Sequence, residues 1–126
     1  MINKQELRLG NWVILHHKHD NDHESELQVK ELSLNGPIQL SNSYSTYIKV
    51  SWEDILPLPI DSCHLKKFGF QETSKDIFSF DDWVYEAPLK LLHWKSGIEL
   101  QVQYVHQLQN IIFTLSRVEL QMSQGS

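Results

Sequence analysis

The segment "HHKHDNDHE", residues 16–24, holds the densest group of side chains that could do chemistry. Its histidines stand among Asp20, Asp22 and Glu24, and such nitrogen and oxygen donors suit Zn²⁺, Ni²⁺ or Cu²⁺. The segment lies between two expected strands, and its Asp-Asn-Asp run is typical of a turn. A loop of that kind gives its ligands no fixed orientation. We therefore expect a solvated hairpin tip rather than a metal site.

Cys63 and His64 are the second candidate, because a thiolate nucleophile needs a nearby base. Neighbouring residues on a helix point about 100° apart, so these two cannot form that hydrogen-bonded pair themselves. A catalytic thiol would need His93 or His106 instead, and the sequence shows no such contact. We expect Cys63 to be an ordinary small residue of a helix.

Other catalytic patterns are absent from the sequence. Asp81 and Asp82 are typical of a hairpin turn rather than of an acid and base pair. The sequence contains no phosphate-binding loop, dinucleotide-binding glycine pattern, nucleophile elbow or metalloprotease helix. An enzyme would need a site assembled from scattered residues, so we expect a protein that is not an enzyme and uses no cofactor.

The stretch "YVHQLQNIIFTL", residues 104–115, predicts a helix without any Asp, Glu, Lys or Arg, although 21% of the chain is charged. At about 100° per residue, one group of its side chains falls within an arc of about 120°, which is enough for a core face. The members of this group are Tyr104, Val105, Leu108, Ile111, Ile112 and Leu115. His106, Gln109 and Phe113 form a second stripe beside Asn110.

Two interpretations of the second stripe stay open. Amide side chains donate and accept, so they could bind the edge of a nucleobase, with an aromatic ring to stack on it and a lysine to meet a phosphate. The candidate ligand-binding residues are His106, Gln109, Asn110, Phe113, Trp94, Tyr85 and Lys66, with Lys67, Lys90 and Lys95 as further cations. Alternatively, the amides bond sheet edges or a second copy of the helix, which would make a homo-oligomer. We favour packing, because buried amides are usually satisfied by protein groups.

Length and composition limit the class of protein. The 126 residues, 40% of them hydrophobic, suffice for one domain or two closely packed subdomains. The net charge of −5 argues against nucleic acid or an anionic membrane as partner. The single cysteine excludes an internal disulfide and fits a cytosolic setting. The sequence has no apolar run long enough for a transmembrane helix, so we expect a cytoplasmic protein.

The first half of the chain predicts short strands separated by turns. The expected strands lie in "NWVILHH", "ELQVKELSL", "PIQL", "YSTYIKV" and "PLPI", with one helical turn in "SWEDIL". Asn35 and Gly36 are a hairpin signal, and Pro37 limits the third strand to a strand start or an edge. Five short strands with a late helical turn suggest an SH3-like small β-barrel over residues 1–60.

The second half, residues 61–122, predicts an α-β-sheet-α subdomain packed with the first half as one unit. Asp61 is a good N-cap for a short helix that Gly69 would end, and Leu65, Phe68 and Phe70 would attach it to the core. Three or four antiparallel strands then follow in "DIFSF", "DWVYEA", "LKLLHWK" and "IELQVQ", before the C-terminal helix. The class is therefore α+β, and residues 123–126 are expected to be a disordered tail.

The segments "LRLGNWV", "ILPLPI", "LKKFGF" and "VQYVHQLQNIIFTL" resemble, in the same order and over nearly the whole chain, a family of small proteins of bacteroidete genomes, prophages and phages. The middle helix departs from the family, with Asp61, Ser62, Cys63 and His64 in place of its usual threonine, glutamates and tryptophan. The resemblance implies a compact accessory protein of a phage or mobile element and brings no catalytic residues.

By association, the resemblance implies a role against host defence. The leading hypothesis is a cytoplasmic anti-defence protein that binds and sequesters a nucleotide-derived immune signal. The alternative is a protein-protein interaction module that binds and inhibits or recruits a host or phage protein.

Overall fold

The computed structural model describes residue 2 and residues 4–17, 23–33 and 38–122 of the chain. The chain divides into two compact units, each of which contains two separate stretches of sequence. The first unit comprises Met1–Leu58 and Tyr104–Ile111, and the second comprises Pro59–Gln103 and Ile112–Ser126. The first unit thus includes a late segment that the expected division at residue 60 did not assign to it.

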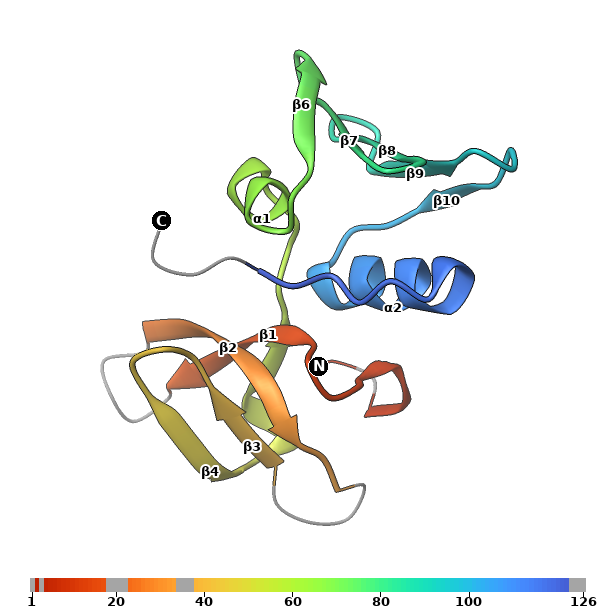
Figure 1. Ribbon diagram of the computed structural model, residues 1–126. Helices are drawn as coiled ribbons and strands as arrows, with labels where there is room; N and C mark the ends of the chain where they lie inside the picture. Colours follow the sequence, from red (N-terminus) through yellow and green to blue (C-terminus); the bar gives the residue numbers. More distant parts are fainter. Residues whose placement is uncertain (1, 3, 18–22, 34–37, 123–126) are drawn as a thin grey trace. The chain divides into compact units, whose positions relative to one another are not determined.

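The first unit contains a five-stranded antiparallel sheet in the order β4-β3-β2-β1-β5. The elements are η1 (Lys4–Glu6), β1 (Trp12–His17), β2 (His23–Glu31), β3 (Ile38–Ser41), β4 (Thr46–Val50), η2 (Trp52–Asp54) and β5 (Ile55–Pro57). Figure 1 shows β1 to β4 side by side in red to yellow. Four of the predicted strands and the helical turn are confirmed, whereas the fifth strand, expected in "PLPI" at residues 57–60, is corrected to Ile55–Pro57.

The two edges of this sheet are β4 and β5. In the part of the chain that the structure describes, no strand pairing joins β4 to β5, so closure into an SH3-like barrel stays a prediction. The predicted Asn35-Gly36 turn and Pro37 lie outside the described residues, as does the tail at 123–126.

The core of the first unit follows the period of two that strands impose on side chains. Its buried members are Ile2, Leu7, Val13, Leu15, Leu27, Val29, Ile38, Leu40 and Ile55. The imperfect alternation of "ELQVKELSL" has a structural cause, because the pairing register of β2 with β3 shifts between Val29 and Glu31. The irregular pattern in the sequence thus marks a bulge within a strand.

The second unit begins with α1 (Ser62–Lys67), and both predicted ends of this helix are confirmed. Asp61 Oδ1 accepts the His64 N–H at 2.8 Å, and the Asp61 N–H donates to His64 Nδ1 at 3.3 Å, which completes a capping box. Gly69 has φ +102°, and a Cβ there would lie 3.3 Å from the Phe80 ring. Leu65 is buried, as expected of the side that attaches α1 to the core.

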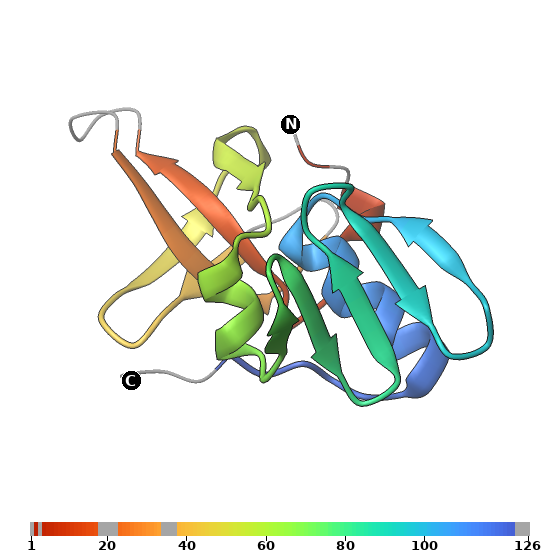
Figure 2. The same cartoon turned by 90° about the horizontal axis from the view of Figure 1, so that it is seen from above.

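A second antiparallel sheet follows α1 in the order β10-β9-β8-β7-β6, seen in green to cyan in Figure 2. Its strands are β6 (Gln71–Ser74), β7 (Ile77–Phe80), β8 (Trp83–Glu86), β9 (Leu91–Trp94) and β10 (Glu99–Gln101). The expected three or four strands are corrected to five. The sequence did not indicate β6 because its four residues are polar and exposed, so it carries no apolar alternation.

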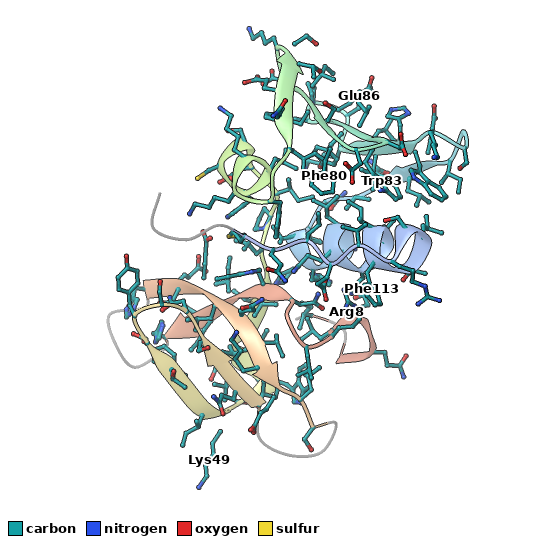
Figure 3. All side chains as sticks on the ribbon, viewed as in Figure 1. Arg8, Lys49, Phe80, Trp83, Glu86 and Phe113 are labelled. Atoms are coloured by element: carbon teal, nitrogen blue, oxygen red, sulfur yellow. The ribbon has the colours of Figure 1, made fainter. Side chains whose placement is uncertain are left out.

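One face of this second sheet is rich in aromatic side chains. Register pairs Phe78 with Tyr85 and Phe80 with Trp83, and Figure 3 shows Phe80 beside Trp83. Trp83 also pairs with Trp94, and their rings stack 5.2 Å apart at 12°. Because paired residues lie on the same side of a sheet, these five rings share one face, which we call the aromatic layer.

The long helix α2 (Val105–Ser116) begins where the uncharged stretch predicted it. The Tyr104 N–H donates to Gln107 Oε1 at 3.2 Å, which is a cap that the sequence did not suggest. Arg117, at φ 60°, follows the last turn in the left-handed region. None of the helices in the described part of the chain is long and apolar enough to span a membrane.

The predicted core face of α2 needs correction. Leu115 is exposed and Ile111 is only half-buried, whereas His106 and Gln109 are buried completely. The apolar pattern around the helix did not predict the burial of His106 and Gln109, because these polar side chains share the inner face with apolar ones. The predicted functional stripe is thus partly an internal surface.

Candidate functional site

Gln109 is buried in the first unit and uses both ends of its amide. Its Oε1 accepts the backbone N–H of Trp12 at 2.9 Å, and its Nε2 donates to the backbone oxygen of Gly10 at 2.9 Å. The Gly10 oxygen also accepts from Gln28 Nε2 at 2.9 Å. The Gln109 amide therefore joins α2 to the start of β1, because it accepts from and donates to backbone groups in the way that a neighbouring strand does.

Asn110, the next residue, contacts the segment just before β1. Its Oδ1 accepts from Arg8 Nε at 2.7 Å and from Asn11 Nδ2 at 2.9 Å, and its Nδ2 donates to the Glu6 oxygen at 2.6 Å. These partners occupy three of the four hydrogen-bonding positions of the Asn110 amide. A ligand that used Asn110 would first have to displace them.

Asn11 completes this arrangement from the other side. It is fully buried, and its Oδ1 accepts the Arg8 N–H at 2.6 Å. Arg8 Nη2 in turn donates to the Gln109 backbone oxygen at 3.4 Å. We call the three side chains of Asn11, Gln109 and Asn110, with their partners between Glu6 and Trp12, the amide clasp.

His106 lies one turn before Gln109 on the same helix. Its side chain is 1% exposed, and neither ring nitrogen has a hydrogen-bond partner among the residues that the structure describes. Burial lowers the pKa of His106, and the nearby charge of Glu6 opposes this with a smaller effect. The ring of Tyr104 lies 6.2 Å from the ring of His106 and nearly parallel to it. Among the described residues, His106 is therefore a buried ring whose neutral form is favoured and whose nitrogens make no hydrogen bond.

The remaining candidate ligand residues belong to the second unit. Tyr85 is buried, burial raises its pKa to about 12, and its hydroxyl donates to the Val102 oxygen at 2.8 Å. Trp94 is half-buried in the aromatic layer. The guanidinium carbon of Arg117 lies over the ring of Phe113, 5.9 Å from the ring centre. Of these aromatic side chains, Tyr85 is buried, whereas Trp94 and Phe113 are each partly exposed.

The lysines predicted as phosphate ligands also lie in the second unit. Lys66 Nζ is 3.8 Å from Glu72 Oε1, and Lys95 Nζ is 3.1 Å from Asp82 Oδ2. These exposed pairs contribute about 0–1 kcal/mol each to stability. A phosphate at either lysine would compete with a carboxylate that is already present.

The amide clasp joins "LRLGNWV" and "VQYVHQLQNIIFTL", two of the segments on which the family resemblance rests. Neither a family model, nor a curated protein, nor a solved structure matches this chain. The resemblance to phage and bacteroidete proteins therefore stays a prediction.

The histidine-rich segment lies between β1 and β2, which pair antiparallel up to His17 and His23. The rings of His17 and His23 stack 4.0 Å apart across the paired ends of β1 and β2, and His17 Nε2 lies 2.9 Å from Ser25 Oγ. The residues at 18–22 lie outside the described part of the chain. Within the described part, no group of three or more His, Cys, Asp or Glu side chains could hold a metal ion.

The candidate catalytic residues do not form a catalytic group within the second unit. Cys63 is an exposed free thiol. His93 Nε2 lies 3.1 Å from Glu86 Oε2, and His93 Nδ1 lies 3.3 Å from Glu99 Oε1, so carboxylates face both ring nitrogens. Asp81 has φ 51° in the turn between β7 and β8, which confirms the turn prediction.

Sequence reasoning missed a group of exposed residues at the edge of the first sheet. Tyr44 is 89% exposed and Ile48, in the edge strand β4, is 67% exposed. Asn42 Oδ1 accepts the N–H groups of Tyr44 and Ser45 at 2.8 and 2.9 Å, so the turn that presents Tyr44 is fixed by its own hydrogen bonds. The only signal in the sequence was a large aromatic residue within the polar run "SNSYS".

Proposed function

We propose that this protein is a non-enzymatic binding module that docks an extended polypeptide along strand β4. The observation that carries the proposal is the exposure of Tyr44 and Ile48 at one edge of the sheet. An edge strand offers backbone groups for pairing, and neighbouring apolar side chains give such pairing its specificity. In the phage or mobile-element setting that the resemblance implies, the partner would be a host or phage protein met in the host cytoplasm.

Several features of the first unit support this choice over a ligand at the helix. The amides of Gln109 and Asn110 are engaged by protein groups, so they do not offer free edges to a nucleobase. The strand order with a helical turn before β5 is compatible with an SH3-like sheet, a class that uses its surface to bind peptides. Lys49, with φ 57°, interrupts the regular edge, and its side chain points away from the sheet in Figure 3. The irregular backbone at Lys49 would limit unspecific pairing of β4 with other strands, and the Lys49 ammonium group would favour an acidic partner.

Photo-crosslinking tests the proposed surface directly. A photoreactive phenylalanine analogue at Tyr44 should crosslink a polypeptide from host lysate, and the same analogue at Leu89 is the matched control. Leu89 is 60% exposed but belongs to the second unit. The partner recovered in this way should bind the Ile48→Glu variant about tenfold or more weakly, because an apolar anchor in an interface is worth about 1–2 kcal/mol. Equal crosslinking at both positions would contradict the proposal.

A second candidate function is sequestration of a nucleotide-derived immune signal, and the half-exposed Trp94 favours it. A nucleobase stacked on an aromatic side chain gains about 1–3 kcal/mol, and the ring of Trp94 is already held in place by Trp83. A panel of cyclic and linear nucleotides should then raise the melting temperature, and the Trp94→Ala variant should lose the response. The Tyr44→Ala variant is the control. A melting temperature that no nucleotide changes would rule out this candidate, and native mass spectrometry would report retained ligand and any homo-oligomer.

A further inference from the structure

His106 has an environment that its packing role does not explain. A neutral imidazole always carries one donor and one acceptor, and burying them without partners destabilises the folded state. Both ring nitrogens of His106 are in this situation among the described residues. A phenylalanine of similar size would fill the same space without that penalty. The ring is therefore the least satisfied polar side chain on the inner face of α2 in the first unit.

The charged and titratable groups around His106 in the first unit have defined positions. Glu6, at the end of η1, is exposed, so solvent screens its attraction for a protonated ring. The guanidinium of Arg8 is turned to the clasp, where it donates to Asn110 Oδ1 at 2.7 Å. Tyr104 contributes a nearby aromatic ring. None of these contacts gives a protonated His106 a direct buried acceptor in the part of the chain that the structure describes.

We propose that His106 makes the amide clasp sensitive to acid, so that proton uptake by its buried ring releases Gln109 from Gly10 and Trp12. The ring and the amide of Gln109 are one helical turn apart on the same inner face, so a change that moves the ring toward water also moves Gln109. This device is independent of the proposed function. It would loosen the first unit and leave the hydrogen bonds of the second unit intact.

The direction of the pH dependence follows from burial. The pKa of His106 is lowered in the folded state, whereas in the unfolded chain it takes its ordinary value of about 6.5. Below about pH 6.5 the unfolded or opened chain therefore binds more protons than the closed one. The stabilisation from the neutral ring is complete above that pH and is lost as the pH falls toward the folded pKa. One such group changes the opening equilibrium by at most about tenfold per pH unit.

Amide hydrogen exchange measures the opening of the clasp at one bond. The Trp12 N–H, which donates to Gln109 Oε1, reports on the clasp, and the Val102 N–H, which donates to the Lys90 oxygen at 2.8 Å, is an internal reference in the second unit. Between about pH 7.5 and about pH 5 we expect the protection factor of Trp12 to fall, by at most about thirtyfold, while that of Val102 changes little. A constant protection factor for Trp12 would overturn the proposal.

Two variants separate His106 from the other histidines. In His106→Phe the Trp12 protection factor should stay constant over the same pH range, and in His93→Gln the acid response should persist. A fall that survives in His106→Phe would overturn the proposal. If that variant does not fold, the ring carbon signals of His106 in the unmodified protein decide by NMR. Titration of the folded protein's ring at about pH 6.5 would contradict the proposal, and titration at lower pH would support it.

Discussion

Replacing Gln109 with methionine is expected to lower the free energy of unfolding by about 2–3 kcal/mol. Methionine keeps the length of the side chain but removes both hydrogen bonds, so the Trp12 N–H loses its acceptor. The Gly10 oxygen keeps its bond from Gln28, which limits the loss. Urea unfolding followed by circular dichroism and tryptophan fluorescence measures the change.

Two further variants test the reason for that loss. Gln109→Glu retains an acceptor for the Trp12 N–H but cannot donate to the Gly10 oxygen, and it places a carboxylate at a fully buried position, so we expect it to be at least as destabilising. Thr114→Ala changes an exposed residue of the same helix and should stay within about 0.5 kcal/mol of the unmodified protein. If Gln109→Met behaves like Thr114→Ala, the clasp does not stabilise the first unit.

Replacing Trp83 with alanine is expected to cost about 3–5 kcal/mol, the largest single effect in the second unit. Trp83 is 2% exposed, pairs in register with Phe80 and Trp94, and stacks its ring on the latter. Its removal loses both the burial of a large ring and the contacts of its neighbours. Thermal and urea unfolding would show the loss as a lower midpoint.

Trp94→Ala is the matched comparison for that variant. It removes the same side chain from the same stack, but Trp94 is only half-buried, so less apolar surface returns to water and the loss should be clearly smaller. Leu89→Ala, at an exposed turn position, should change stability by no more than about 0.5 kcal/mol. Equal losses for the two tryptophans would mean that the stack itself, rather than burial, dominates.

The elements that the sequence predicted well have local causes. Strands β1 to β4 each carry β-branched or aromatic residues between turn formers, and α1 has its cap and its terminating glycine next to it in sequence. Asp61 and Gly69 begin and end α1 through contacts with residues close to them in sequence, so the ends of the helix can be predicted without tertiary structure. β6 was missed because its polar residues give no local signal; its place comes from pairing with β7.

The clasp could not be derived from the sequence because its bonds join residues about a hundred positions apart. Gln109 and Asn110 were recognised as amides that needed partners, but both partners of Gln109 and one partner of Asn110 are backbone groups, which every residue carries. A periodicity count assigns side chains to a face and does not identify what that face meets. The preference for packing over a ligand was inferred from the usual satisfaction of buried amides.

The exposed edge was missed for the opposite reason. Ile48 lies in a strand whose apolar residues would suit a core equally well, and only the sheet order places that strand at an edge. Tyr44 likewise depends on the turn that Asn42 holds. Whether an apolar residue is exposed depends on whether distant parts of the chain pack over it, and the neighbouring sequence does not contain that information.

The composition of the first unit from two distant stretches has a consequence for how the chain is made. During synthesis, Met1–Leu58 leaves the ribosome first, and all of Pro59–Gln103 follows before Gln109 and Asn110 emerge. The sheet of the first unit can pair early, but the segment before β1 must wait for those amides. The earlier stretch is thus completed by residues synthesised later, and until then the Trp12 N–H is open to water or to a chaperone.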